Sequence, residues 1–107
     1  MAEVDLTGAV MSCGDGTHAN LDRVNLHKAR LVGANMRGVY MMDANLRNAD
    51  LQNADLAGAI LSGTTMRGAN VRGADFAGVE LAAVVMEFAN FSEARNADIP
   101  TGKMHLR

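Results

Sequence analysis

The residue types that most often carry chemistry are few in this chain and lie far apart. The 107 residues include one cysteine and three histidines: Cys13, His18, His27 and His105. The histidines do not fall at ligand spacing, and no second cysteine or acidic cluster joins them, so we expect no metal site. No arrangement of serine, histidine and aspartate for nucleophilic catalysis can be assembled either. We therefore predict a protein that is not an enzyme and that uses no cofactor.

A pair of glycines near the N-terminus is the other feature that could bind a small ligand. Residues 12–18 read Ser-Cys-Gly-Asp-Gly-Thr-His. A glycine-rich loop cradles phosphate when a helix start and a lysine follow it, and neither follows here. We interpret this segment as a frayed or looped side of the structure, and Cys13 as an exposed or half-buried thiol.

A five-residue period runs through most of the chain, and the structure that it specifies must position the side chains. From Leu21 to Phe91, each fifth residue is large and apolar, and the residue two positions before it is alanine, valine or Thr64. An α-helix turns about 100° per residue, so a step of five would scatter these residues around it. A single strand alternates its faces with a period of two, so an odd step would flip them. The period predicts short extended pieces that bend at each repeat toward the same side and stack coil upon coil.

The remaining positions of the repeat carry turn residues. Asn or Asp precedes most of the large residues, and these side chains hydrogen-bond nearby backbone groups in turns. Most glycines, such as Gly58 and Gly78, stand two residues after a large one. We expect the corner of the coil at that position, because glycine tolerates the backbone angles that a corner needs.

Units such as Ala44-Asn45-Leu46-Arg47-Asn48 and Ala54-Asp55-Leu56-Ala57-Gly58 resemble the A(D/N)LXX unit of the pentapeptide-repeat proteins. The resemblance implies an all-β fold, a right-handed quadrilateral β-helix of about four to five coils with four units in each coil. The frame extends backward through Leu6 and Met11 without insertion. Four sides are also supported by the alanines at every twentieth position, which are Ala9, Ala29, Ala49, Ala69 and Ala89.

Length and composition limit the architecture. With 107 residues we expect a single domain over 1–107, with regular repeats over about 19–95, an irregular first coil at 4–18 and a C-terminal tail at 96–107. The chain has no Trp, one Tyr and three Phe, so its core must be thin and aliphatic. The N-terminus has neither a basic nor an apolar signal region, and no apolar run approaches a membrane span. We therefore expect a cytoplasmic protein with no membrane contact.

The balance of acidic and basic residues helps to distinguish the binding functions that the resemblance suggests. Some relatives of this fold are linked to protecting DNA gyrase by imitating DNA, which requires a dense negative face. Between residues 21 and 91 the chain instead carries seven acidic and seven basic residues. With four units per coil, two short stripes would form, which we take as candidate partner-binding faces with an ordinary solvated surface as the alternative. The acidic stripe would consist of Asp15, Asp55 and Asp75, and the basic stripe of Arg47 and Arg67 stacked with His27.

The last full coil departs from the pattern, because it has apolar residues where polar ones are usual. Val85 takes an Asn or Asp position, and Phe88 takes a glycine position. Met86 and Phe91 are inward large residues of the same region. A buried end of the solenoid would account for them. We predict a homodimer that meets through Val85, Met86, Phe88 and Phe91, with packing of the C-terminal tail over this surface as the alternative.

We therefore predict a non-enzymatic solenoid that acts as a protein-interaction or structural module, with a protein as its partner. The alternative is a DNA-mimic regulator of DNA gyrase or topoisomerase, of the quinolone-resistance type, which the resemblance favours and the charge balance disfavours. Direct binding of nucleic acid would rest on Arg47 and Arg67. It is disfavoured by a formal net charge of −2 and by the lack of interleaved aromatic residues.

Overall fold

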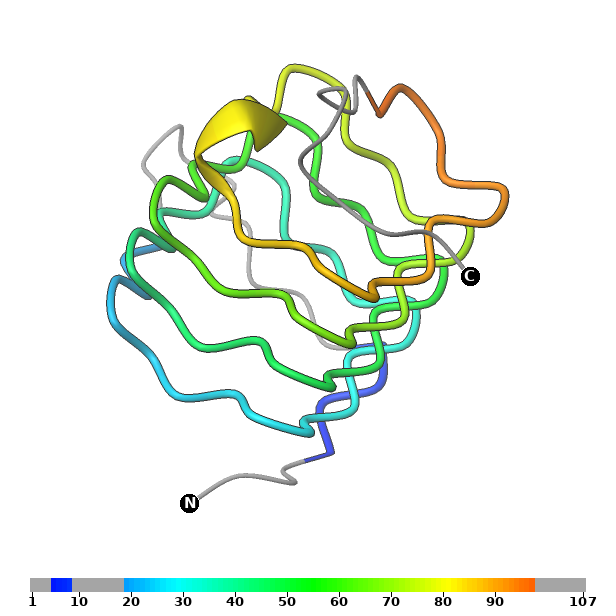
Figure 1. Ribbon diagram of the computed structural model, residues 1–107, viewed down its shortest axis with the longest axis horizontal. Helices are drawn as coiled ribbons and strands as arrows, with labels where there is room; N and C mark the ends of the chain where they lie inside the picture. The colour runs from blue at the N-terminus through cyan, green and yellow to red at the C-terminus, as the bar shows by residue number, and fades with distance from the viewer. Residues whose placement is uncertain (1–4, 9–18, 98–107) are drawn as a thin grey trace.

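The computed structural model of the protein describes residues 5–8 and 19–97. The chain winds as a right-handed, four-sided β-helix whose coils stack on one another (Figure 1). Parallel bridges join residues twenty apart, as from Asn25 to Asn45 and from Asn45 to Thr65. Each side contributes a single bridging residue per coil, so the described residues contain no longer strand. Their one helical element is η1, a 3-10 helix at Leu81–Ala83.

Each side of a coil repeats the same local geometry, and it is the geometry that the turn residues predict. The outward Asn45 accepts a hydrogen bond at its Oδ1 from the Arg47 N–H two residues later, at 3.0 Å. The second turn residue has a positive φ, 57° at Asn48. The turn then closes with a hydrogen bond from the Ala49 N–H to the Leu46 carbonyl, at 3.1 Å. This cycle brings the next small residue inward and starts the next side.

The core is built from the two inward positions of each repeat, as the period predicts. Leu46, Leu51 and Leu56 are completely buried, together with most of the small residues that precede the large ones. The exceptions lie at the two ends of the regular coils, where Leu21 and Val24 at one end and Ala94 at the other are only half-buried. Side chains of an end coil are covered less because they have fewer neighbouring coils to pack against.

The first described residues pair one unit further along the chain than the repeat predicts. Asp5 bridges Arg30, and the Gly8 N–H donates to the Val32 carbonyl at 2.8 Å. The separation between Asp5 and Arg30 is 25 residues, not twenty. The five-residue spacing of the sequence extends back to Leu6, but the pairing between coils is shifted there by one repeat unit. The expected wall positions of Ala9, Met11 and Asp15 lie outside the described residues.

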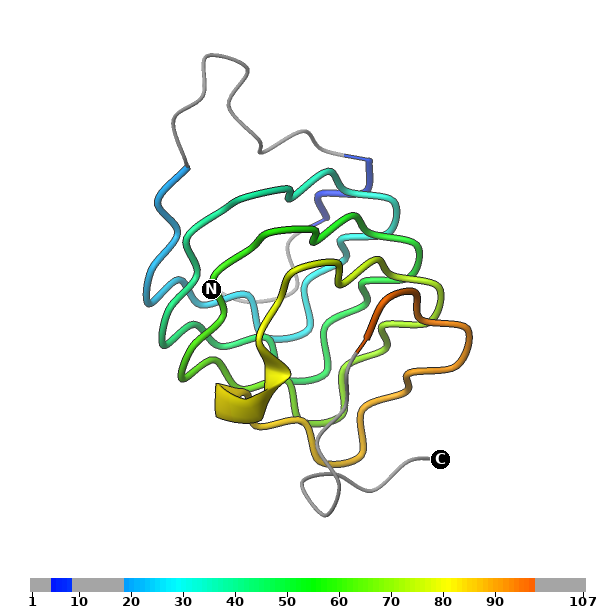
Figure 2. The same ribbon diagram turned by 90° about the horizontal axis from the view of Figure 1, so that it is seen from above.

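The second departure is η1, which projects from a corner of the coil (Figure 2). A regular corner pairs an N–H with the carbonyl nineteen residues later, as Gly58 does with Ala77 at 2.7 Å. Next to η1, the Gly63 N–H donates to the Ala83 carbonyl at 2.9 Å, one residue further on. The five-residue sequence spacing is kept through η1, but the pairing slips. No helix in the described part of the chain is long and apolar enough to cross a membrane.

Candidate interaction surface

One side of the coil carries apolar residues at two neighbouring outward positions, between Asn20 and Glu80. We call it wall A, and its inward large residues are Leu21, Met41, Leu61 and Leu81. Tyr40 and Ile60 bridge each other on this wall and are 39% and 40% exposed. Met42, at the adjoining corner, is 40% exposed. These three side chains form an apolar patch on a coil whose outward positions are mostly polar.

The wall A patch forms without loss of the local turn. Tyr40 cannot supply the carboxylate or amide oxygen that Asn45 supplies to its own turn. The Met42 N–H instead donates a hydrogen bond to Asp22 Oδ1 of the neighbouring coil, at 2.8 Å. The five-residue period alone does not single out this patch. The sequence signal for it is that Tyr40 and Ile60, twenty residues apart, both replace the usual Asn or Asp.

Beside Ile60 the bridging ladder is interrupted by η1. Bridges join Tyr40 to Ile60 and Thr65 to Val85, but among the described residues none joins Ile60 to Glu80. The Leu61 N–H and the Ala59 carbonyl have no hydrogen-bond partner in this part of the chain. Buried backbone groups in proteins are almost always paired, with protein or with water. A hollow of about 300 Å³ opens at this missing rung, lined by Ala59, Ile60, Leu61, Ser62, Gly78 and Glu80.

The basic stripe lies at a different corner, where Arg47 and Arg67 occupy the same turn position on successive coils. We call this place the arginine corner, defined by Arg47, Asn48, Arg67, Gly68 and Phe88, which line a hollow of about 360 Å³. The Arg67 guanidinium lies over the Phe88 ring, with Cζ 5.0 Å from the ring centroid. Its Nη1 also lies 3.6 Å from Glu87 Oε1. Arg47 has no ion-pair partner among the described residues.

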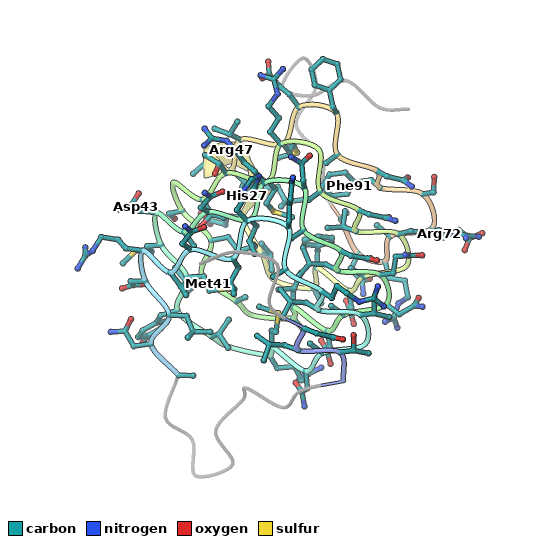
Figure 3. The ribbon with its side chains drawn as sticks, turned by 90° about the horizontal axis from the view of Figure 1, so that it is seen from below. His27, Met41, Asp43, Arg47, Arg72 and Phe91 are labelled. Carbon is teal, nitrogen blue, oxygen red and sulfur yellow. The ribbon has the colours of Figure 1, made fainter. Side chains whose placement is uncertain are left out.

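His27 continues the basic stripe on the coil before Arg47. The Lys28 N–H donates to the Arg47 carbonyl at 2.9 Å, which places the two coils in direct contact there. Figure 3 shows His27 and Arg47 on the same side of the coils, whereas Arg72 projects from another side. No group of three or more His, Cys, Asp or Glu within residues 5–8 and 19–97 could hold a metal ion. Cys13, His18 and His105 lie outside the described residues.

The four residues predicted to form a dimer contact divide into two pairs. Met86 is completely buried and Phe91 is 7% exposed, so both belong to the core of the single chain. The Phe91 ring packs against the Phe76 ring, with centroids 5.4 Å apart. Val85 and Phe88 are 46% and 39% exposed. Of the four, only these two have a large exposed fraction.

The two described members of the acidic stripe, Asp55 and Asp75, already have partners within the chain. Asp55 and Asp75 bridge each other on one wall, and Asp15 lies outside the described residues. Asp55 Oδ2 lies 3.0 Å from Arg37 Nη1. Asp75 Oδ1 accepts a hydrogen bond from Asn96 Nδ2 at 2.9 Å. This bond is the main cause that lowers the pKa of Asp75 below its ordinary value, and a hydrogen bond from the Ala77 N–H is the second cause.

Comparison with known proteins places the repeat within a family. The family model for pentapeptide repeats matches the chain in eight copies, over residues 1–38, 40–78 and 59–95. No curated protein matches the sequence.

Solved structures show the same fold. The chain is similar to HetL, a pentapeptide repeat protein involved in heterocyst differentiation regulation from the cyanobacterium Nostoc sp. strain PCC 7120. The two share 24% identity with a TM-score of 0.75, over 98% of this chain and 51% of HetL. A second pentapeptide repeat protein from Nostoc PCC 7120 gives 25% identity and a TM-score of 0.59, over 96% of this chain and 84% of the other.

A pentapeptide repeat protein of the Arabidopsis thaliana thylakoid lumen gives 22% identity and a TM-score of 0.55, over 92% of this chain and 68% of the other. This chain therefore spans about half the length of HetL and a larger share of the other two proteins. At these identities the likeness concerns the fold.

Proposed function

The chain belongs to the pentapeptide-repeat family, and from that premise we propose that it is a non-enzymatic protein-interaction module whose protein partner binds wall A. The observation that carries this proposal is the apolar patch of Tyr40, Met42 and Ile60 beside the missing rung. Clustered exposed apolar side chains on a soluble domain mark interaction sites. Burying them would contribute roughly 25 cal/mol for each Å² removed from water.

The missing rung adds a directional element to this apolar contact. The Leu61 N–H and the Ala59 carbonyl stand two residues apart on the same edge of the coil. One residue of an extended peptide, running parallel to this edge, satisfies such a donor and acceptor together. Addition of a partner's extended segment to a sheet is a recurrent mode of peptide recognition, and here the segment would have to enter the hollow beside Ala59 and Leu61, which are themselves buried. Ile60 would then lie against the side chains of the added segment.

Charge pairing argues against the alternative of a DNA mimic. A protein that competes for a phosphate-binding groove needs an unbroken negative face. Here the acidic residues are interspersed with arginines, and four of them form ion pairs with arginines in the described part of the chain. The ion pairs are Arg30 with Asp5, Arg37 with Asp55, Arg67 with Glu87, and Arg72 with Glu93. We therefore place protein binding at wall A ahead of topoisomerase regulation.

Photo-crosslinking tests the proposal. A benzoylphenylalanine replacing Tyr40 should crosslink to one defined protein in the host cell, and the same group replacing Arg95 on another wall should not. The captured protein is then purified and its affinity measured. Ile60→Lys should weaken binding about tenfold or more, because it places a charge in a desolvated contact. Thr65→Lys, at the same repeat position on the next wall, is the matched control and should bind as the unaltered protein does.

Two results would overturn the proposal. Equal crosslinking from positions 40 and 95 would show that wall A is not preferred. A crosslink from position 40 to a second copy of this chain would assign the patch to self-association instead.

A further inference from the structure

The arginine corner contains a recess that arises from the stacking of three turn residues. Asn48, Gly68 and Phe88 occupy the same turn position on successive coils. Backbone hydrogen bonds join their coils: the Asn48 N–H donates to the Arg67 carbonyl and the Gly68 N–H to the Glu87 carbonyl, each at 2.9 Å. Gly68 has no side chain, and a Cβ built there would overlap the side-chain oxygen of Asn48. The Asn48 side chain thus fills the space that a side chain at position 68 would take, and a hollow of about 360 Å³ remains beside these three residues.

The charge of the recess is positive. Two positively charged guanidinium groups, of Arg47 and Arg67, line it. One carboxylate, of Glu87, lies 3.6 Å from Arg67. Arg47 is left without an acidic partner in the described part of the chain. One positive charge therefore remains available to a ligand.

Phe88 forms one side of the recess at a conformational cost. Its φ is +61°, in the left-handed region where the same column has Asn48 and Gly68. A bulky residue in this region is an outlier, and the strain is about 1–3 kcal/mol. Burial in the core does not offset this strain, because the Phe88 side chain is 39% exposed. The same turn position also has a positive φ at Lys28 and Glu93, so this conformation is a requirement of the corner that Phe88 meets at a cost.

We propose that the arginine corner is a binding site, separate from wall A, for a carboxylate carried on an acidic peptide segment of a partner protein. Arg47 would pair with the carboxylate, for which a guanidinium offers two parallel N–H donors. The Phe88 ring would contact the apolar part of the same segment.

Three labelled peptides test this assignment by fluorescence anisotropy with the full chain. The first alternates Glu and Phe and has an amidated C-terminus. The second has Gln in place of Glu, and the third is the Gln peptide with a free C-terminal carboxylate. The Glu peptide should bind at least tenfold more tightly than the amidated Gln peptide, and high salt should weaken it. Tighter binding of the third peptide than of the second would identify a terminal carboxylate as a further source.

Variants connect the binding to the corner. Arg47→Gln should weaken the Glu peptide about tenfold or more, since hydrogen bonds to charged groups are worth about 1.5–3 kcal/mol. Arg72→Gln, at the same repeat position on another corner, should bind as the unaltered protein does. Phe88→Gly should lose affinity while its thermal midpoint stays equal or rises, because glycine suits the positive φ. This combination separates a ligand contact from a structural role.

Three outcomes would overturn the proposal. One is unchanged affinity in both Arg47→Gln and Phe88→Gly. Another is equal binding of the Glu peptide and the amidated Gln peptide. The third is tighter binding of a single-stranded oligothymidylate than of the Glu peptide, which would assign the corner to nucleic acid. Ile60→Lys should leave peptide binding unchanged, so failure at wall A and failure at the arginine corner are distinguished.

Discussion

The Thr64 hydroxyl donates a hydrogen bond to the Met41 carbonyl of the neighbouring coil. The same hydroxyl accepts a hydrogen bond from the Ala44 N–H at 3.2 Å. At a regular corner the two backbone groups bond to each other directly, as the Ala49 N–H does with the Leu46 carbonyl. Thr64 is completely buried and is inserted into the turn of its neighbour.

This insertion predicts that valine is a worse replacement for Thr64 than alanine. In Thr64→Ala the corner can close with the regular bond between the Ala44 N–H and the Met41 carbonyl. In Thr64→Val a methyl group keeps these groups apart, and each unpaired buried group costs about 1–3 kcal/mol. Urea unfolding should give a lower free energy of unfolding for Thr64→Val than for Thr64→Ala. The reverse order would show that volume matters more here than the hydrogen bonds.

Two corner glycines should respond differently to the same substitution. Gly63 and Gly33 both have positive φ, 77° and 68°, so alanine is strained at both. A Cβ at Gly63 would also overlap the Asp43 carboxylate, whereas at Gly33 it meets nothing within 4 Å. We expect Gly63→Ala to lower the thermal midpoint more than Gly33→Ala. Adding Asp43→Ala to Gly63→Ala should remove the difference, and persistence of the difference would contradict the overlap.

Acid titration should report the hydrogen bond between Asn96 and Asp75. This bond is the main cause that lowers the pKa of Asp75 below the ordinary value of 3.8. A lowered pKa in the folded state stabilises the fold fully above pH 3.8, and the contribution is lost as the pH falls through the lowered value. In Asn96→Ala the Asp75 carboxyl should titrate closer to 3.8 by NMR. An unchanged titration would place the cause elsewhere.

The homodimer at the C-terminal coil remains a prediction, and the structure narrows it to Val85 and Phe88 because Met86 and Phe91 are buried. Val85→Asp should then convert a dimer into a folded monomer, measured by light scattering with circular dichroism as the check on folding. A contact through Phe88 would cover the arginine corner. The acidic peptide should therefore compete with dimerisation. A monomeric unaltered protein at high concentration would exclude the dimer.

Much of the fold follows from the sequence, because each side of the coil is a local structure. The five-residue step determines which residues face inward, and Asn45 and Asp75 build their turns from atoms two residues away. The twenty-residue step also places Arg47 and Arg67 on neighbouring coils. Such features need only the repeat and its four sides, which the family resemblance supplies.

Pairing between coils was decided by the tertiary structure. The spacing of five continues unbroken through Leu6 and through Leu81, yet Asp5 pairs 25 residues away and Ile60 has no bridge to Glu80 in the described residues. Whether two residues form a bridge depends on how two distant segments pack. A shift in the pairing between coils leaves the five-residue spacing unchanged, so the sequence does not show it.

The candidate sites have the same origin. The missing rung leaves the Leu61 N–H and the Ala59 carbonyl without a partner in the described residues at wall A, and the hollow at the arginine corner is lined by Asn48, Gly68 and Phe88 from three coils. The sequence by itself determined which side chains face outward. Which of them enclose a hollow was decided only by the stacking of coils, because residues twenty and forty positions apart come into contact only there.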